Sequence, residues 1–178
     1  MRALTLFAIT LVFVPSAVAQ TMPKMPAELR AGLVARFDEA SDKLVRLAEA
    51  IPADKYRWRP KAGTRSVSEL LVHVANGHYY TADNAGAKPP FEIRQDSETA
   101  ITNKAQVIQY LKRSSRHLGD GMRNLEEGGL RKPATMFKQE TTVGNVFLFG
   151  VTHMHEHLGQ LVSYARMNGV APPWSAKE

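Results

Sequence analysis

The histidines near the C-terminus are the residues best suited to chemistry. Three of the six histidines in the chain, His153, His155 and His157, fall within five residues. If this run is helical, His153 and His157 are an i, i+4 pair whose imidazoles leave the same face one turn apart. His155 lies about 200° round the helix from His153 and points elsewhere. Two imidazoles on one turn supply half of a transition-metal site, whereas the alternative is a helix with surface histidines.

The surroundings of this pair help to choose between the two alternatives. A helix through the run places a mainly apolar set of residues on the face of His153 and His157: Val143, Val146, Phe149, Gly150, Leu161 and Tyr164. Surface histidines would lie on the polar face instead. A buried imidazole needs a partner for each nitrogen, and two stacked imidazoles cannot satisfy each other fully. A metal ion between them removes the difficulty, so the pattern favours a metal site.

The third ligand is predicted at His73. It shares an inward face of an earlier predicted helix with Leu70, Gly77 and Tyr80. Alone it would be explained more simply as a core histidine bonded to a carbonyl group, but two other inward histidines favour the metal. Because the chain contains no cysteine, the ligands must be imidazole, carboxylate or water. Three imidazoles with an open position are typical of a catalytic site, and Zn²⁺ or Ni²⁺ is the expected single divalent ion.

Several polar residues near the expected metal are candidates for proton transfer. Glu69, one turn before His73, is the first candidate for a general base, although its spacing from Ser66 also predicts a helix-capping role. The other candidates are Asn76, Tyr80, Gln160 and Tyr164. His78 is expected to point away from the site, and His117 to be exposed to solvent.

Four amphipathic segments are expected to position these side chains. Apolar residues recur at three- and four-residue steps, and capping signals predict helices over residues 27–51, 66–84, 103–125 and 143–168. No segment has a convincing strand pattern, and the connections are long enough to cross over. The sequence therefore predicts an all-α four-helix bundle, with residues 26–178 as one domain. A second apolar stripe, shared by His155, Leu148 and Val151, indicates a homodimer interface.

The first residues have the organisation of a secretory signal peptide. Met1-Arg2 gives a positive start, residues 3–14 are mainly apolar, and Ala17-Val18-Ala19 is an A-x-A cleavage signature. We expect cleavage after Ala19, a short tether over residues 20–25, and export, to the periplasm of a bacterium. The alternative of an uncleaved membrane anchor needs about 20 apolar residues, more than this run supplies. No stable membrane anchor is therefore expected to remain after cleavage.

The charge of the chain says little about its partners. The formal net charge is +6, but the basic residues are scattered, without interleaved aromatic residues or a recognition motif. We therefore expect no nucleic acid as a partner, and a small molecule as the substrate.

The order of several short motifs resembles the DinB-like family. These are Trp58-Arg59-Pro60, the run from Ser66 to Ala75, His153-x3-His157-x-Gly159-Gln160, and Arg166-x2-Gly169-x2-Pro172-Pro173. The resemblance implies an up-up-down-down bundle, often dimeric, with one divalent metal held by His73, His153 and His157. Many members have a further histidine just before the last ligand, where this chain has Glu156.

The resemblance limits the function without naming a reaction. Characterised members include thiol S-transferases and isomerases that use bacterial low-molecular-weight thiols, and some metal-dependent hydrolases. Export argues against the thiol enzymes, because such thiols are cytosolic cofactors and the exported compartment is oxidising. The expected function is a metal-dependent hydrolase or transferase. The alternatives are a non-catalytic exported metal-binding or stress-related protein, and a plain bundle whose three histidines do not converge.

Overall fold

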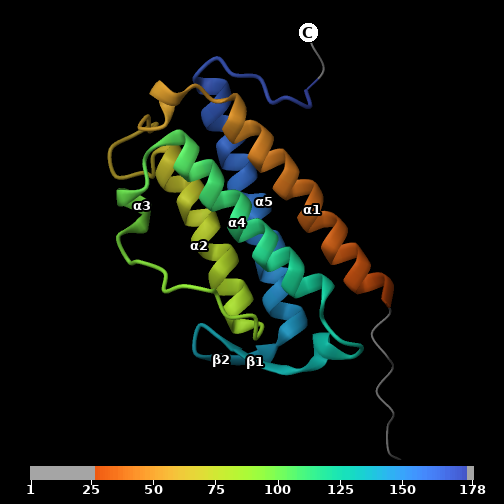
Figure 1. The fold of residues 1–178 in the computed structure, drawn as a ribbon. Helices are drawn as coiled ribbons and strands as arrows, with labels where there is room; N and C mark the ends of the chain where they lie inside the picture. Colours follow the sequence, from red (N-terminus) through yellow and green to blue (C-terminus); the bar gives the residue numbers. More distant parts are fainter. Residues whose placement is uncertain (1–26, 176–178) are drawn as a thin grey trace, which may run out of the picture.

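Four long helices form the protein, in a computed structural model that describes residues 27–175. They are α1 (Ala27–Ala50), α2 (Val67–Asn84), α4 (Lys104–Arg123) and α5 (Val143–Met167), and they pack as a bundle (Figure 1). The short helices are η1 (Ala53–Lys55), α3 (Ser97–Ala100) and η2 (Gly129–Arg131). The predicted signal peptide and tether lie outside the described residues. Within those residues, no helix combines the length and the apolar character needed to cross a membrane.

The predicted caps set the helix boundaries. The Ser66 hydroxyl accepts from the Glu69 N–H, and the Glu69 carboxylate accepts from the Ser66 N–H, which is a capping box at the start of α2. Asn103 caps α4 and Thr142 caps α5 through their side-chain oxygens. Gly169 follows α5 with a φ of 72°, a left-handed conformation that suits glycine. Each long helix therefore begins where the sequence predicted.

The helices run up-down-down-up, which corrects the expected up-up-down-down order. Helices α2 and α4 are parallel, because Asn76 bonds to Tyr110, and His78, further along α2, bonds to Ser114, further along α4. Helices α1 and α4 are antiparallel, because Lys104 at the start of α4 donates to carbonyl groups at the C-terminal end of α1. The four-helix bundle is confirmed, whereas the helix directions differ from those expected.

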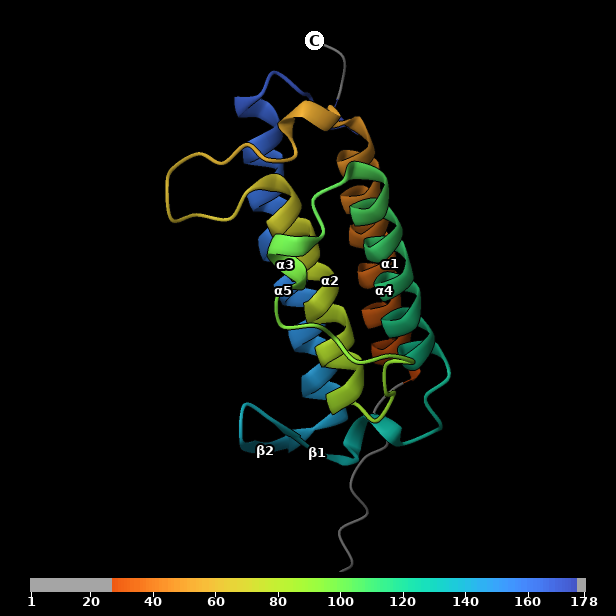
Figure 2. The same cartoon turned by 60° about the vertical axis from the view of Figure 1, so that its left-hand side comes forward.

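The connections explain these directions. The chain after α1 turns back at one end of the bundle through η1, whereas residues 85–103 return along the length of α2 before α4 begins (Figure 2). One crossover therefore lies between α2 and α4, not before α2. Helix α5 then runs antiparallel to α2, so that Gly150 near its start lies against Thr81 near the end of α2. This arrangement brings the first half of α2 beside the second half of α5.

A β-hairpin interrupts the connection before α5, where no strand was expected. Strands β1 (Pro133–Met136) and β2 (Gln139–Thr142) are antiparallel, and Met136 pairs with Gln139 across a two-residue turn. The expectation of no strand was wrong because each strand has only four residues, too few for a clear alternation. The turn residues, Phe137 and Lys138, are also unlike the Asn-Gly pair that marks most such turns.

The remaining histidines lie away from the three predicted ligands. His155 points away from the ligands, as predicted, and is exposed. His117 was expected to be exposed but is half-buried, because its Nε2 donates to the Ala87 carbonyl at 3.0 Å. The predicted homodimer stays a prediction: in the apolar stripe beside His155, Leu148 is exposed whereas Val151 is buried within the bundle.

His78 is a fully buried imidazole in the core. Its Nδ1 lies 3.1 Å from the Ser114 hydroxyl, its ring contacts Phe37 edge-on, and its Nε2 has no hydrogen-bond partner. Burial lowers the pKa of His78 to about 3, from 6.5. The neutral form is therefore the one that fits the core.

This burial predicts acid sensitivity. Because the unfolded state takes up the His78 proton near pH 6.5 and the folded state only near pH 3, stability is complete above pH 6.5 and is lost as the pH falls towards 3. The expected slope from one such proton is about 1.4 kcal/mol per pH unit. Urea unfolding of metal-free protein, repeated at several pH values from about 7 to about 4, measures this slope.

The variant His78→Gln should be less stable than the wild type at pH 7. Its free energy of unfolding should also fall less steeply as the pH is lowered, because the buried imidazole is absent. The difference between the two pH curves isolates His78 from the other histidines. His155→Gln, which removes an exposed imidazole, is the matched control. Parallel curves for the wild type and His78→Gln would contradict the prediction.

Candidate metal centre

The three predicted ligands converge between α2 and α5. The Nε2 atom of His153 lies 3.2 Å from the Nε2 atom of His73 and 3.1 Å from that of His157. Two nitrogens that are each about 2.0–2.1 Å from one zinc ion lie about 2.9 Å apart at a right angle and about 3.3 Å apart at a tetrahedral angle. Both observed separations fall in this range. The residues present therefore fit one divalent metal ion, and the three rings come together as predicted.

The protonation of these rings suits metal binding. His157 is buried, whereas His73 and His153 are half-buried. Burial, together with a smaller effect of the neighbouring His157 and His73, lowers the pKa of His153 to about 4. Burial also lowers the pKa of His157, although a hydrogen bond to Gln160 partly opposes it. His153 and His157 are therefore neutral at pH 7, with lone pairs available to a metal.

A carboxylate orients the first ligand. The Nδ1 atom of His73 donates to Glu98 Oε1 at 2.8 Å, so the lone pair of its Nε2 faces the other histidines. Glu98 Oε2 in turn accepts from Arg65 Nε at 2.8 Å. Burial alone raises the pKa of Glu98, but Arg65 and His73 bring it below the usual value for glutamate. Glu98 is therefore a charged acceptor that fixes the tautomer and the orientation of His73.

A neutral chain of side chains orients the last ligand. His157 Nδ1 donates to Gln160 Oε1 at 3.0 Å, and Gln160 Nε2 donates to the Tyr164 hydroxyl at 2.9 Å. That hydroxyl donates to the carbonyl oxygen of Arg65 at 3.2 Å. Because the side chain of Arg65 also donates to Glu98, a chain of hydrogen bonds through Arg65 connects His157 to His73. Gln160 and Tyr164 are close to the site, as predicted, but they act on a ligand.

Packing holds the middle ligand. The ring of His153 stacks on Phe149, with centroids 5.4 Å apart and planes at 21°. Gly77 of α2 also lies against this ring, since an added Cβ atom there would be only 2.6 Å from His153 Cε1. The ring therefore occupies space that only glycine leaves open. No side chain larger than glycine fits at position 77 without moving His153.

Glu69, the predicted general base, caps the start of α2. Its carboxylate accepts from the Ser66 N–H at 2.7 Å and from Arg59 at 3.0 Å. Burial alone raises the pKa of Glu69, but these two donors lower it overall. A carboxylate held in this way is a weak proton acceptor. The structure shows the capping role, and the catalytic role stays a prediction.

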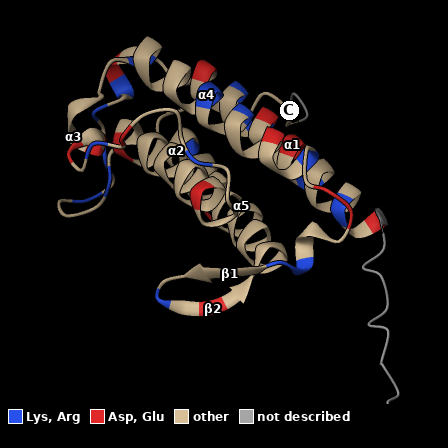
Figure 3. Cartoon of the chain, turned by 60° about the horizontal axis from the view of Figure 1, so that its bottom comes forward, with Lys and Arg blue, Asp and Glu red and all other residues tan. Residues whose placement is uncertain are grey.

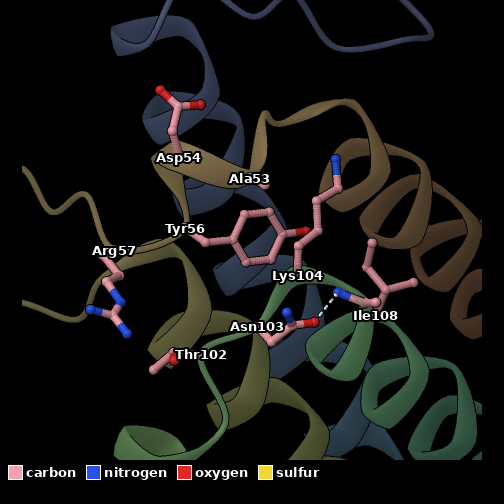
Figure 4. A pocket seen from close by; sticks show the side chains of 9 residues that line it. Ala53, Asp54, Tyr56, Arg57, Thr102, Asn103, Lys104 and Ile108 are labelled. Atoms are coloured by element: carbon pink, nitrogen blue, oxygen red, sulfur yellow. Dashed lines mark hydrogen bonds between the residues drawn. The ribbon is translucent and has the colours of Figure 1, made fainter.

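The pocket in Figure 4 is separate from this centre. It has a volume of about 670 Å³, and none of the three histidines is among the residues that line it: Ala53, Asp54, Tyr56, Arg57, Thr102, Asn103, Lys104, Ala105 and Ile108. Lys104 donates to the carbonyl groups of Glu49 and Ile51, and the Tyr56 hydroxyl donates to that of Ala48. These donors satisfy carbonyl groups at the C-terminal end of α1, so the polar residues of this pocket have a structural role.

Comparisons with known proteins identify the family. Residues 36–161 match the DinB superfamily. The chain belongs to this superfamily. No curated protein sequence matches it.

Solved DinB-like structures share the fold of this DinB-superfamily chain. A DinB-like protein from Bacillus cereus has a TM-score of 0.71 at 12% identity, covering 82% of this chain and 96% of its own. YfiT from Bacillus subtilis, described as a probable metal-dependent hydrolase with an unusual four-helix bundle topology, has a TM-score of 0.66 at 17% identity, covering 84% and 93%. A second DinB-like protein from B. subtilis reaches 0.62 at 21% identity, covering 78% and 92%. At these identities the likeness establishes the fold alone.

The Glu98 contact predicts a change in metal affinity for this DinB-superfamily protein. In Glu98→Gln, the acceptor of the His73 N–H loses its charge, so zinc affinity should fall by about 10–100-fold, as for other partners of metal ligands. Competition with a chromogenic chelator measures the affinity. Asp96→Asn is the matched control, because Asp96 pairs with Arg94. Equal affinity in Glu98→Gln and the wild type would show that the contact does not support the metal.

Proposed function

We propose that this protein binds one divalent metal ion through His73, His153 and His157 and uses it in a hydrolase or transferase reaction on a small molecule. The observation that carries the proposal is the convergence of three Nε2 atoms, two of whose rings donate from Nδ1 to fixed acceptors. Three imidazoles without thiolate suit zinc or nickel. When bound, such an ion polarises a carbonyl or phosphoryl group or lowers the pKa of bound water.

The protein side chains supply orientation and access. Glu98 and Gln160 hold two ligand rings in fixed tautomers, and Gly77 with Phe149 holds the third between α2 and α5. The side chain of His73 keeps 25% of its surface exposed, which supports access of solvent to the centre. A catalytic metal needs a coordination position that solvent or substrate can reach. The non-catalytic alternative, a metal that only links two helices, needs no such access.

Cobalt-substituted protein tests for the exchangeable position. Acetohydroxamate, a small chelating anion, should bind at the open position and change the visible absorption of the cobalt ion. His153→Ala should lose this response. A stoichiometric cobalt complex whose spectrum is unaffected by acetohydroxamate would support the non-catalytic alternative.

A substrate panel then tests the reaction. Zinc-loaded protein is incubated with chromogenic carboxylic esters, amides and phosphate esters, each with and without a chelator. The proposal predicts turnover in at least one class, abolished by the chelator and in His153→Ala. Turnover that survives in His153→Ala would assign the activity to another site.

Export is part of the proposal and rests on the sequence of residues 1–19. The full-length chain, expressed in a bacterium, should be recovered from the periplasm with Gln20 as its first residue. N-terminal sequencing of the periplasmic fraction decides this. Recovery of the protein only in the cytoplasm, with residues 1–19 intact, would refute export and reopen thiol-dependent transferases as a model.

A further inference from the structure

The turn of the β-hairpin is strained. Phe137 and Lys138 have φ values of 52° and 63°, the left-handed region that glycine and asparagine normally occupy in a two-residue hairpin turn. A side chain with a Cβ atom is disfavoured there. Phe137 also keeps 61% of its surface exposed, although it is a large apolar residue. The left-handed backbone and the exposed part of the ring are both unfavourable, and strained residues cluster at ligand-binding sites.

The Phe137 ring contacts both helices that carry the three histidines. Its centroid lies 5.3 Å from that of Phe149 on α5, with the rings edge-on, and 5.5 Å from that of Tyr80 on α2. The hairpin lies across the ends of α2 and α5 in Figures 1 and 2, where these contacts form. The turn thus places a third aromatic ring against both helices that carry the ligands.

This aromatic cluster, defined as Tyr80, Phe137 and Phe149, is continuous with the metal centre. Phe149 stacks on the ligand His153, and it precedes that ligand by one helical turn, about 6 Å along α5. Tyr80 follows the ligand His73 by two turns, about 10 Å along α2. The cluster therefore lies within one small molecule's length of the metal position.

The two helices that carry the metal ligands have few charged side chains. Helices α2 and α5 are mostly free of charged side chains, whereas α1 and α4 carry many (Figure 3). The charged residues of α2 are Glu69 and Asp83, and those of α5 are Glu156 and Arg166. The faces that α2 and α5 present beside the cluster are therefore mainly uncharged, which suits an apolar group.

We infer that Tyr80, Phe137 and Phe149 form a subsite for a planar apolar group, such as a phenyl ring, on a ligand whose polar end binds the metal. The inference rests on the proposed metal site and adds the class of substrate. Aromatic rings prefer the edge-on and offset contacts that this cluster offers. Burial of the exposed face of Phe137 by the ligand stabilises the complex and gives the strained turn a function.

Two hydroxamates that differ only in this group test the inference on zinc-loaded protein. Benzohydroxamate carries a phenyl ring and acetohydroxamate a methyl group, and both bind a metal through the same two oxygens. Wild-type protein should bind benzohydroxamate about 10-fold more tightly. In Phe137→Ala the preference should fall close to equality, with acetohydroxamate binding unchanged. The control Lys138→Gly, which alters the same turn and keeps the ring, should retain the preference.

Two results would overturn the subsite. Phe137→Ala could keep the preference, or it could weaken both hydroxamates equally, which would make Phe137 a support of the metal centre. If neither hydroxamate binds to the wild type, the proposed open position fails, and metal-free protein decides the subsite separately. There, millimolar benzyl alcohol should shift the ring NMR signals of Tyr80 and Phe137 while ethanol does not. Absence of these shifts would refute the subsite.

Discussion

Replacing His153 by alanine should abolish stoichiometric metal binding. The ring of His153 is the one within 3.2 Å of both other ligand nitrogens, so its loss leaves two imidazoles on different helices. We expect zinc affinity to fall by at least about 100-fold, the upper end of what loss of a ligand's partner alone causes. Elemental analysis of purified protein should change from one ion per chain to nearly none.

The matched control is His155→Ala. His155 lies two residues away on the same helix, but it is exposed, and its Nδ1 donates to the Val151 carbonyl of its own helix. Its loss should leave metal content unchanged. Unchanged metal in His153→Ala, or equal losses in both variants, would contradict the site.

Replacing Gly77 by alanine should weaken metal binding although no ligand changes. The new Cβ atom would lie 2.6 Å from His153 Cε1, so the ring must rotate away from the position it shares with His73. Alanine also favours a helix over glycine by about 1 kcal/mol, so the bundle should remain folded. We expect zinc affinity to fall by about 10–100-fold, as for other changes beside a metal ligand, with the helical circular dichroism retained.

Gly159→Ala is the control for this prediction. Gly159 is also a helical glycine, in α5, but no atom lies within 4 Å of an added Cβ. The Gly159→Ala variant should have the same gain in helix propensity and should bind zinc with the affinity of the wild type. Full affinity in Gly77→Ala would show that His153 has room to move, and that the close approach does not position it.

The predictable part of this molecule was the part determined by local patterns. The helices and their caps follow from Ser66, Asn103 and Thr142, whose side chains accept hydrogen bonds within three residues. The convergence of the ligands followed from placing each histidine on an apolar helix face. The family resemblance implied the same three residues, and the family match from residue 36 to 161 agrees with it.

What the sequence did not predict depends on long-range contacts. Glu98 lies 25 residues from His73, in a connection between two predicted helices, and its acidic type was the single available signal. The helix directions depend on where residues 85–103 run, which no periodicity encodes. The hairpin turn at Phe137 and Lys138 contradicts the usual turn composition, so local rules argue against it.

X-ray absorption spectroscopy of the zinc-loaded protein tests the central claim most directly. The proposed centre predicts one zinc ion per chain, three imidazole nitrogens at about 2.0–2.1 Å, and at least one oxygen from solvent or buffer. The three nitrogens are those of His73, His153 and His157, so His153→Ala should not give this spectrum. A zinc ion with fewer than three imidazoles, or one enclosed by four protein ligands, would contradict the account.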